Sequence, residues 1–176
     1  MSEGGGAVGG AFGERLVRAL RLDASLYEEV EHDPSALPQA LGVVSLAAVA
    51  TGLGNPTTFG VIAPVGGLIS AYLGWLASAA LIWVIGVRML NHTSDYGELL
   101  RTLGFAASPQ IVMVVGVVPV LGALAWPLVW LWVVAAYVVA VRQALDVSTG
   151  RALWVCVLAQ ALNWLVVISL ARLLLR

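Results

Sequence analysis

Charge is scarce in this sequence, and lysine is absent altogether. Of 176 residues, 11% are charged and 60% are hydrophobic, and all nine basic residues are arginines. An ordinary soluble domain carries roughly 25% charged residues. A chain with so few polar side chains cannot cover a soluble globule, so we expect its surface to face lipid. The formal net charge of −1 gives no reason to expect a nucleic acid as partner.

Cysteine and histidine are nearly absent as well, which excludes most metal and redox sites. The single Cys156 cannot form an intramolecular disulfide. His32 and His92 lack the His-x-x-x-His spacing that places two ligands on one helix face. Neither a Gly-x-Ser-x-Gly elbow nor a phosphate-binding glycine loop occurs. We therefore expect no enzyme activity, no cofactor and no metal; a bound lipid is compatible with such a chain.

Long uncharged stretches take the place of the missing charges. A spanning helix needs about 20 mostly apolar residues. The sequence predicts an all-α, polytopic membrane protein, a five-helix transmembrane bundle over residues 37–175, with spans at about 37–54, 60–87, 103–121, 123–141 and 152–171. Pro109 and Pro119 fall inside the third span, where they should bend the helix. If these prolines make that stretch re-entrant, four helices span instead.

The positions of the arginines test this count. With the N-terminus in the cytoplasm, seven arginines lie on the cytoplasmic side, the two outer loops contain none, and only Arg172 and Arg176 lie outside. This asymmetry follows the positive-inside rule. It predicts a multi-pass protein of the cytoplasmic (inner) membrane, with the C-terminus on the opposite side.

The chain ahead of the first span has two predicted parts. Residues 1–13 are rich in glycine and predict a flexible tail. Residues 14–33 predict an amphipathic helix that lies in the headgroup region, broken near Asp23, with Ser25 to Glu28 in capping-box spacing. This helix is either a surface anchor that leads into the first span or a docking helix for a soluble partner.

Small and polar residues mark two of the spans. Gly66, Ser70, Gly74 and Ser78 recur every four residues along the second span, which is typical of a face where another helix approaches closely. Gln160 and Asn163 are three apart on the fifth span and predict one polar face. That face either hydrogen-bonds to another helix or lines a path for a solute.

The charged residues between spans form a candidate cytoplasmic polar cluster. Its members come from two loops on the same predicted side: Arg88, Asp95, Glu98, Arg101, Arg142, Asp146 and Arg151. Asp95 followed by Glu98 predicts a capping box at the start of a helix. Glu98 with Arg101, and Arg142 with Asp146, have the spacing of ion pairs. The cluster therefore has three possible roles: caps and ion pairs at helix ends, binding of a partner protein, or catalysis.

Several of these segments together resemble the bacterial branch of the Yip-domain family, the Ypt/Rab-interacting membrane proteins and their prokaryotic relatives. The resemblance lies in "RLDASLYEEVEHDPSALPQALGVV", "DYGELLRTLGFAASPQ", "VVPVLGAL" and "VAVRQALDVSTGRA", and extends over roughly residues 18–167. It implies a five-span helical domain with a cytoplasmic N-terminus. In eukaryotic relatives it implies membrane trafficking with prenylated small GTPases. The Asp-Leu-Tyr-Gly-Pro signature of those members is absent from the first span, so we do not carry that function over.

The sequence favours a non-catalytic accessory, scaffold or assembly subunit that packs against lipid and other membrane proteins, or against a second copy of itself. No charged residue lies near the middle of a span, which argues against a pump or coupled transporter. The alternative is a channel or transporter for a small or lipidic solute, lined by Gln160, Asn163 and Thr51.

Overall fold

The computed structural model describes the backbone of residues 5–54, 63–89 and 94–174, and all regular structure within these ranges is helical. The predicted all-α class is confirmed. Seven α-helices follow one another: α1 (Gly5–Leu20), α2 (Ala24–His32), α3 (Leu37–Gly54), α4 (Ala63–Trp83), α5 (Tyr96–Ala106), α6 (Pro119–Ala144) and α7 (Thr149–Leu174). Three segments of other helical type lie between them: the 3₁₀ turn η1 (Pro34–Ala36), the π-helical η3 (Val84–Met89) and the 3₁₀ helix η4 (Ser108–Val117).

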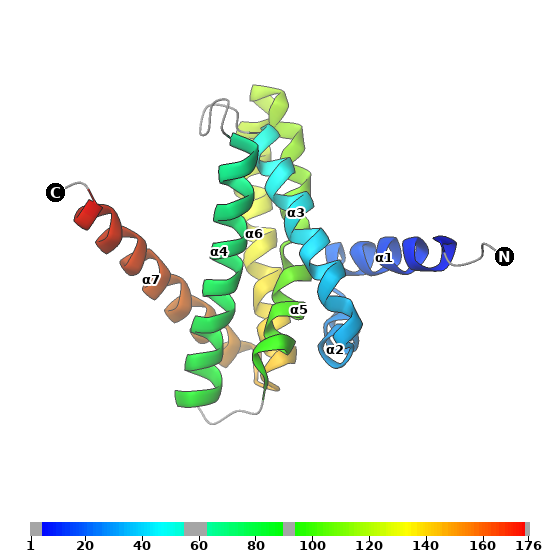
Figure 1. Ribbon diagram of the computed structural model, residues 1–176, viewed down its shortest axis with the longest axis vertical. Coiled ribbons are helices and arrows are strands. Elements are labelled where there is room, and N and C mark those ends of the chain that lie inside the picture. The colour runs from blue at the N-terminus through cyan, green and yellow to red at the C-terminus, as the bar shows by residue number, and fades with distance from the viewer. Residues whose placement is uncertain (1–4, 55–62, 90–93, 175–176) are drawn as a thin grey trace.

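The N-terminal part forms two helices that differ in detail from the prediction. α1 begins at Gly5, within the stretch expected to be a tail, and it projects sideways from the bundle (Figure 1). Phe12, midway along α1, lies close to Gly42 of α3: a Cβ added to Gly42 would lie 3.7 Å from the Phe12 ring. This contact holds the middle of α1 against the bundle. The chain turns at Leu22, whose φ is 58°, and Asp23 caps α2 by accepting a hydrogen bond from the Ser25 N–H. The cap is therefore Asp23, where the sequence suggested Ser25.

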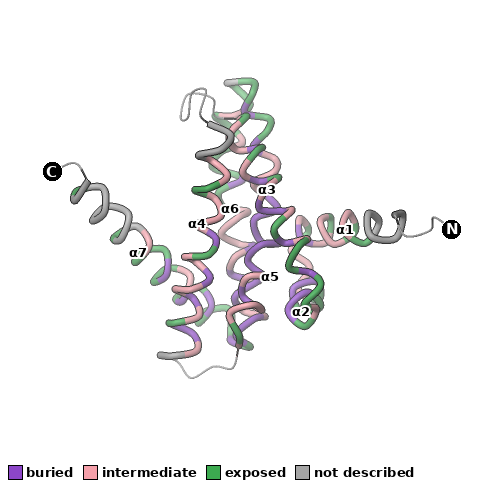
Figure 2. The backbone as a smooth tube through the Cα atoms, viewed as in Figure 1, coloured by how far each residue is buried: buried purple, intermediate pink, exposed green. Residues whose placement is uncertain are grey.

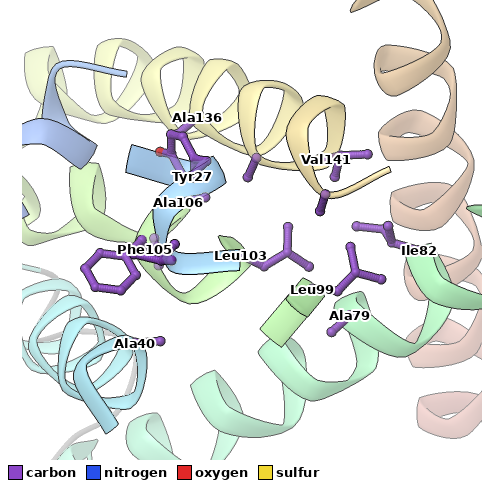
Figure 3. Close-up of a cluster of buried hydrophobic side chains, with 14 of the residues drawn as sticks. Tyr27, Ala40, Ala79, Ile82, Leu99, Leu103, Phe105, Ala106, Ala136 and Val141 are labelled. Carbon is purple, nitrogen blue, oxygen red and sulfur yellow. The ribbon is translucent and has the colours of Figure 1, made fainter. Parts of the chain in front are cut away.

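The short helix α5 forms the centre of the bundle. Leu99, Leu103, Phe105 and Ala106 are fully buried, and purple colouring follows α5 where it lies among its neighbours (Figure 2). Figure 3 shows these side chains between Ala40 of α3, Ala79 and Ile82 of α4, and Ala136 and Val141 of α6. A helix this short is marginal alone in water, so burial on all sides must stabilise it.

The third predicted span is broken, as its prolines suggest. α5 ends at Ala106, and the chain continues from Ser108 to Val117 as a 3₁₀ helix with buried Pro109 in its first turn. Proline has no N–H and disfavours α-helix at the residue before it, which accounts for the change of helix type at this point. Pro119 lies at the start of α6 and not inside the third span, because its fixed φ and missing N–H suit a first helical turn. The turn to α6 is therefore at Val118, earlier than predicted.

Four helical segments are long and apolar enough to cross a membrane. They are Pro34–Gly54, Gly67–Val87, Tyr96–Val117 and Val120–Ala144, within the residues that the structure describes. The first four predicted spans correspond to these segments, although residues 60–62 of the second lie outside the described residues. The fifth predicted span lies in α7, which is not among the four, so five spans are not established by the fold.

The described side chains of α7 pack against the bundle in the first half of the helix. Ala152, Val155 and Ala159 are buried at helical spacing against α4 and α6. Beyond them the helix diverges from the bundle, so that its C-terminal end lies far from α1, on the opposite side of the molecule (Figure 1). Gln160, Ala161 and Leu162 are three successive exposed residues. Since successive residues point about 100° apart around a helix, these three residues form a broad side of α7 that the bundle does not cover, whereas Ala159 and Asn163 lie on the covered side.

Candidate functional site

The stretch that starts α5 is a capping box, as predicted. The Asp95 carboxylate accepts a hydrogen bond from the Glu98 N–H at 2.9 Å, and the Glu98 carboxylate accepts one from the Asp95 N–H at 2.8 Å. The Ser94 hydroxyl donates to the same Glu98 carboxylate at 3.0 Å. These bonds satisfy amide groups that the first helical turn leaves without intrahelical partners. Both acids therefore act as helix-start groups.

Arg101 lies inside the protein and is not a surface charge. Its residue is 7% exposed, and the guanidinium donates from Nε to the Val30 carbonyl at 2.9 Å and from Nη2 to the Glu31 carbonyl. These two carbonyls belong to the last turn of α2, where backbone acceptors have no partner within the helix. A cation is also favoured there by the helix dipole. Arg101 therefore joins α5 to the end of α2, a contact that the sequence did not reveal because the partners are backbone atoms about 70 residues away.

The remaining members of the predicted polar cluster do not form the expected ion pairs. The Arg142 guanidinium donates to the Gln143 side chain at 3.1 Å, Asp146 is exposed in a tight turn with φ of 49°, and Arg151 is exposed. The Arg88 side chain lies outside the described residues. Among the described residues, all salt bridges instead involve Arg15 and Arg18. The predicted cluster is thus not one site: Asp95 and Glu98 cap a helix, Arg101 is buried, and Asp146 and Arg151 are exposed.

The ion pairs that do form join α1 to α2. Arg15 contacts Glu29 at 2.9 Å and Asp33 at 2.8 Å, while Arg18 contacts Asp23 at 2.9 Å and also Glu29. Hydrogen bonds from Ser25, followed by the one from Arg18, lower the pKa of Asp23 to about 2. The sequence signal for this network is the acidic run of residues 28–33 that follows Arg15, Arg18 and Arg21.

Glu31 is the one buried carboxylate near the end of α2. Burial, followed by the negative charges of Glu98 and Asp146, raises its pKa to about 7, although the charge of His32 acts in the opposite direction. Three carboxylates from α2, α5 and the α6–α7 turn thus lie near one another. Within the described residues, no group of three such side chains has the arrangement of a metal site.

The raised pKa of Glu31 makes stability depend on pH. The folded state holds the proton more tightly, so this contribution is complete below about pH 4.5 and is lost as pH rises toward 7. We expect Glu31→Gln to stabilise the protein at pH 8 by about 1–2 kcal/mol, allowing for partial solvent screening, and to change little at pH 4.5. Thermal unfolding in a mild detergent at both pH values measures this. The exposed Glu28→Gln is the control, and equal effects of the two substitutions at pH 8 would refute the assignment.

Close helix contacts occur at glycines other than the predicted row on α4. In that row Ser70 is exposed, a Cβ added to Gly74 would meet nothing within 4 Å, and the surroundings of Gly66 lie outside the described residues. A Cβ on Gly104 of α5 would instead lie 2.6 Å from the Ala40 Cβ on α3. A Cβ on Gly116 would lie 2.4 Å from the backbone oxygen of Gly54. Helix-to-helix approach within the chain therefore depends on α5 and η4.

A cavity with both polar and apolar lining lies within the bundle. Of the two polar residues predicted on the fifth span, one lines it and the other does not. The cavity has a volume of about 220 Å³, and Asn163 lines it together with Ser78 of the small-residue row, Gln110 and Tyr137. Gln160 is exposed on α7 and Thr51 is half-buried on α3, and neither lines the cavity. The single polar face expected for span five is thus divided between the cavity and the outer surface.

One comparison with known proteins identifies the family. The model of the Yip1 domain matches residues 27–171, which is well over half of the chain. No curated protein and no solved structure matches. Gly104, Pro109, Pro119 and Gly122, which belong to the segments "DYGELLRTLGFAASPQ" and "VVPVLGAL" of the resemblance, all lie in the central α5–η4–α6 region. The chain belongs to the Yip1-domain family of membrane proteins, a non-catalytic family whose members act in membrane trafficking, and it is therefore not an enzyme.

Proposed function

We propose that the protein is a five-span accessory or scaffold subunit of the bacterial cytoplasmic membrane, and that α7 packs against a helix of another membrane protein. The observation that supports this is Gln160. Its side chain is exposed on the part of α7 that leaves the bundle, and within the described residues it has no hydrogen bond. An amide in lipid without a partner is costly, whereas one that bonds across a helix interface contributes about 0.6–2 kcal/mol.

The apolar surface of α6 and α7 supports the same proposal. Trp130 and Leu131 of α6 and Trp154, Leu158 and Leu162 of α7 are all exposed large hydrophobic residues. Lipid can cover such residues, so they do not require a protein partner by themselves. The hydrocarbon part of lipid cannot form a hydrogen bond with an amide, and therefore Gln160 supports a helix as the partner.

The second candidate, a channel or transporter, has less support. A path through the bundle would use Gln160, Asn163 and Thr51, of which Asn163 alone lines the cavity. The cavity is more consistent with a binding site than with a continuous path.

The proposed five-span topology places the N-terminus in the cytoplasm and the C-terminus outside. It also places α1 in the headgroup region. α1 runs crosswise to α4 and α6 (Figure 1), as a helix lying in the membrane plane would, and its ion pairs join it to α2. We expect a C-terminal alkaline phosphatase fusion to be active and a C-terminal green fluorescent protein fusion to be dark. An N-terminal green fluorescent protein fusion, which should fluoresce, is the control. A fluorescent C-terminal fusion would mean an even number of spans.

The partner interaction is tested by purification from the native membrane in mild detergent. Wild-type protein should co-purify with one or a few defined membrane proteins, and Gln160→Leu should reduce their recovery by about 3-fold to 10-fold because one interhelical hydrogen bond is lost. Val157→Leu, an apolar change on the exposed surface nearer the bundle, is the control. Recovery of the wild type as a lone monomer at native expression would contradict the proposal.

A further inference from the structure

The cavity within the bundle is formed by five separate parts of the chain. α3 and α4 contribute small and apolar residues, the α5–η4 junction contributes Gln110, α6 contributes Tyr137, and α7 contributes Asn163. Its volume of about 220 Å³ is several times the roughly 30 Å³ that a water molecule occupies in the liquid. Gly74 lies at its wall, and a Cβ added there would meet no atom within 4 Å, so the space continues up to the α4 backbone.

The polar side chains in this cavity are not paired with the protein. Ser78, Gln110, Tyr137 and Asn163 are each half-buried, and in the described part of the chain none of them makes a hydrogen bond. Trp75 differs, because its indole N–H donates to the Leu100 carbonyl at 3.1 Å. Polar groups at membrane depth are unfavourable without a hydrogen-bond partner, so something in the cavity should bond to them. Four such groups from four elements around one space indicate a ligand site.

The chemistry of the lining selects the ligand. Among the described residues that line the cavity there is no arginine, histidine or carboxylate, so a phosphate or an ammonium group would have no opposite charge there. Two amides and two hydroxyls offer both donors and acceptors, which suits hydroxyl and carbonyl oxygens. Exposed apolar residues of α4, among them Ile69 and Leu73, offer a surface along which acyl chains can lie.

We propose that this cavity binds the head group of an uncharged lipid that carries hydroxyl and carbonyl oxygens, of the diacylglycerol class. The head group bonds to Gln110, Tyr137 and Asn163, and the acyl chains follow the exposed side of α4. The exposed face of α7 around Gln160 stays available to the proposed partner helix, because Gln160 is not part of the lining.

The test uses the purified full-length protein in phosphatidylcholine vesicles with a diazirine-bearing diacylglycerol as the photoaffinity probe. Labelling should map to peptides of α4 and α7. Unlabelled diacylglycerol should displace it, whereas phosphatidic acid with the same acyl chains should displace it at least about tenfold less effectively.

Variants separate the cavity from the general lipid surface. Gln110→Leu with Asn163→Leu should lower the labelling roughly 5-fold to 10-fold, since two hydrogen bonds are lost. Tyr137→Phe, which removes one oxygen and preserves packing, should lower the labelling about 2-fold to 5-fold. This single variant still tests the proposal if the double variant does not fold. Glu28→Gln, at an exposed position of α2 outside the lining, is the control and should label as wild type does. Equal labelling of all variants, equal displacement by phosphatidic acid, or labelling of α4 and α7 no stronger than that of α2 would each overturn the proposal and leave water as the occupant.

Discussion

Replacing Arg101 with methionine is expected to destabilise the protein by about 2–4 kcal/mol. The substitution keeps much of the side-chain volume but removes both donors to the Val30 and Glu31 carbonyls. Each acceptor left buried without a partner costs about 1–3 kcal/mol. The end of α2 would then lose its contact with α5. Thermal unfolding in mild detergent measures the loss, and limited proteolysis should show earlier cleavage between α2 and α3.

Two further variants define what Arg101 contributes. Arg101→Lys keeps the charge but cannot present two donors in a fixed planar arrangement, so we expect an intermediate loss of stability. Arg151→Met removes an exposed arginine and should change stability by no more than about 0.5 kcal/mol. If Arg101→Met were as stable as Arg151→Met, the buried contact between α5 and α2 would not contribute to folding as described.

Replacing Gly116 with alanine is expected to cost about 1–3 kcal/mol. The added Cβ would lie 2.4 Å from the Gly54 backbone oxygen and 3.0 Å from its Cα, so backbone would have to move. Such overpacking is costly because neither α3 nor η4 can rearrange a side chain to make room. The shift in unfolding temperature in mild detergent measures this cost.

Gly74→Ala is the matched control for Gly116→Ala. Its Cβ would meet nothing within 4 Å, and alanine favours helix over glycine by up to about 1 kcal/mol, so it should be neutral or stabilising. A large loss of stability from Gly74→Ala, together with no loss from Gly116→Ala, would mean that the close helix contact is made by the small-residue row on α4.

The sequence predicted helix type and approximate position well because both depend on local signals. Uncharged stretches of sufficient length predicted α3, α4 and α6, and the spacing of Asp95 and Glu98 predicted the cap of α5. Pro109 predicted a break, although not that a 3₁₀ helix would follow it. These features depend on residues within about ten positions of one another.

Features that depend on contacts between distant segments could not be predicted. Arg101 bonds to backbone carbonyls, which carry no mark in the sequence. The glycines at close approach differ from those in the regular row because approach depends on how α3, η4 and α6 are placed. Gln160 and Asn163 lie about 60° apart around the helix, and the bundle covers only the side that carries Asn163. In each case the outcome depends on how the helices pack in three dimensions, which the sequence pattern does not show.

The account assigns the partner surface to α7 and not to the polar residues near α2 and α5. The capping box and the Arg101 contact use the groups that had seemed free for a partner, whereas Gln160 has none. The measurement that tests this most directly is photo-crosslinking in the native membrane, with benzoyl-phenylalanine at the exposed Ala161 of α7 and, separately, at the exposed Glu28 of α2. We predict one discrete protein adduct from position 161 and none from position 28. Adducts to lipid alone from position 161, or a protein adduct from position 28 only, would contradict the assignment.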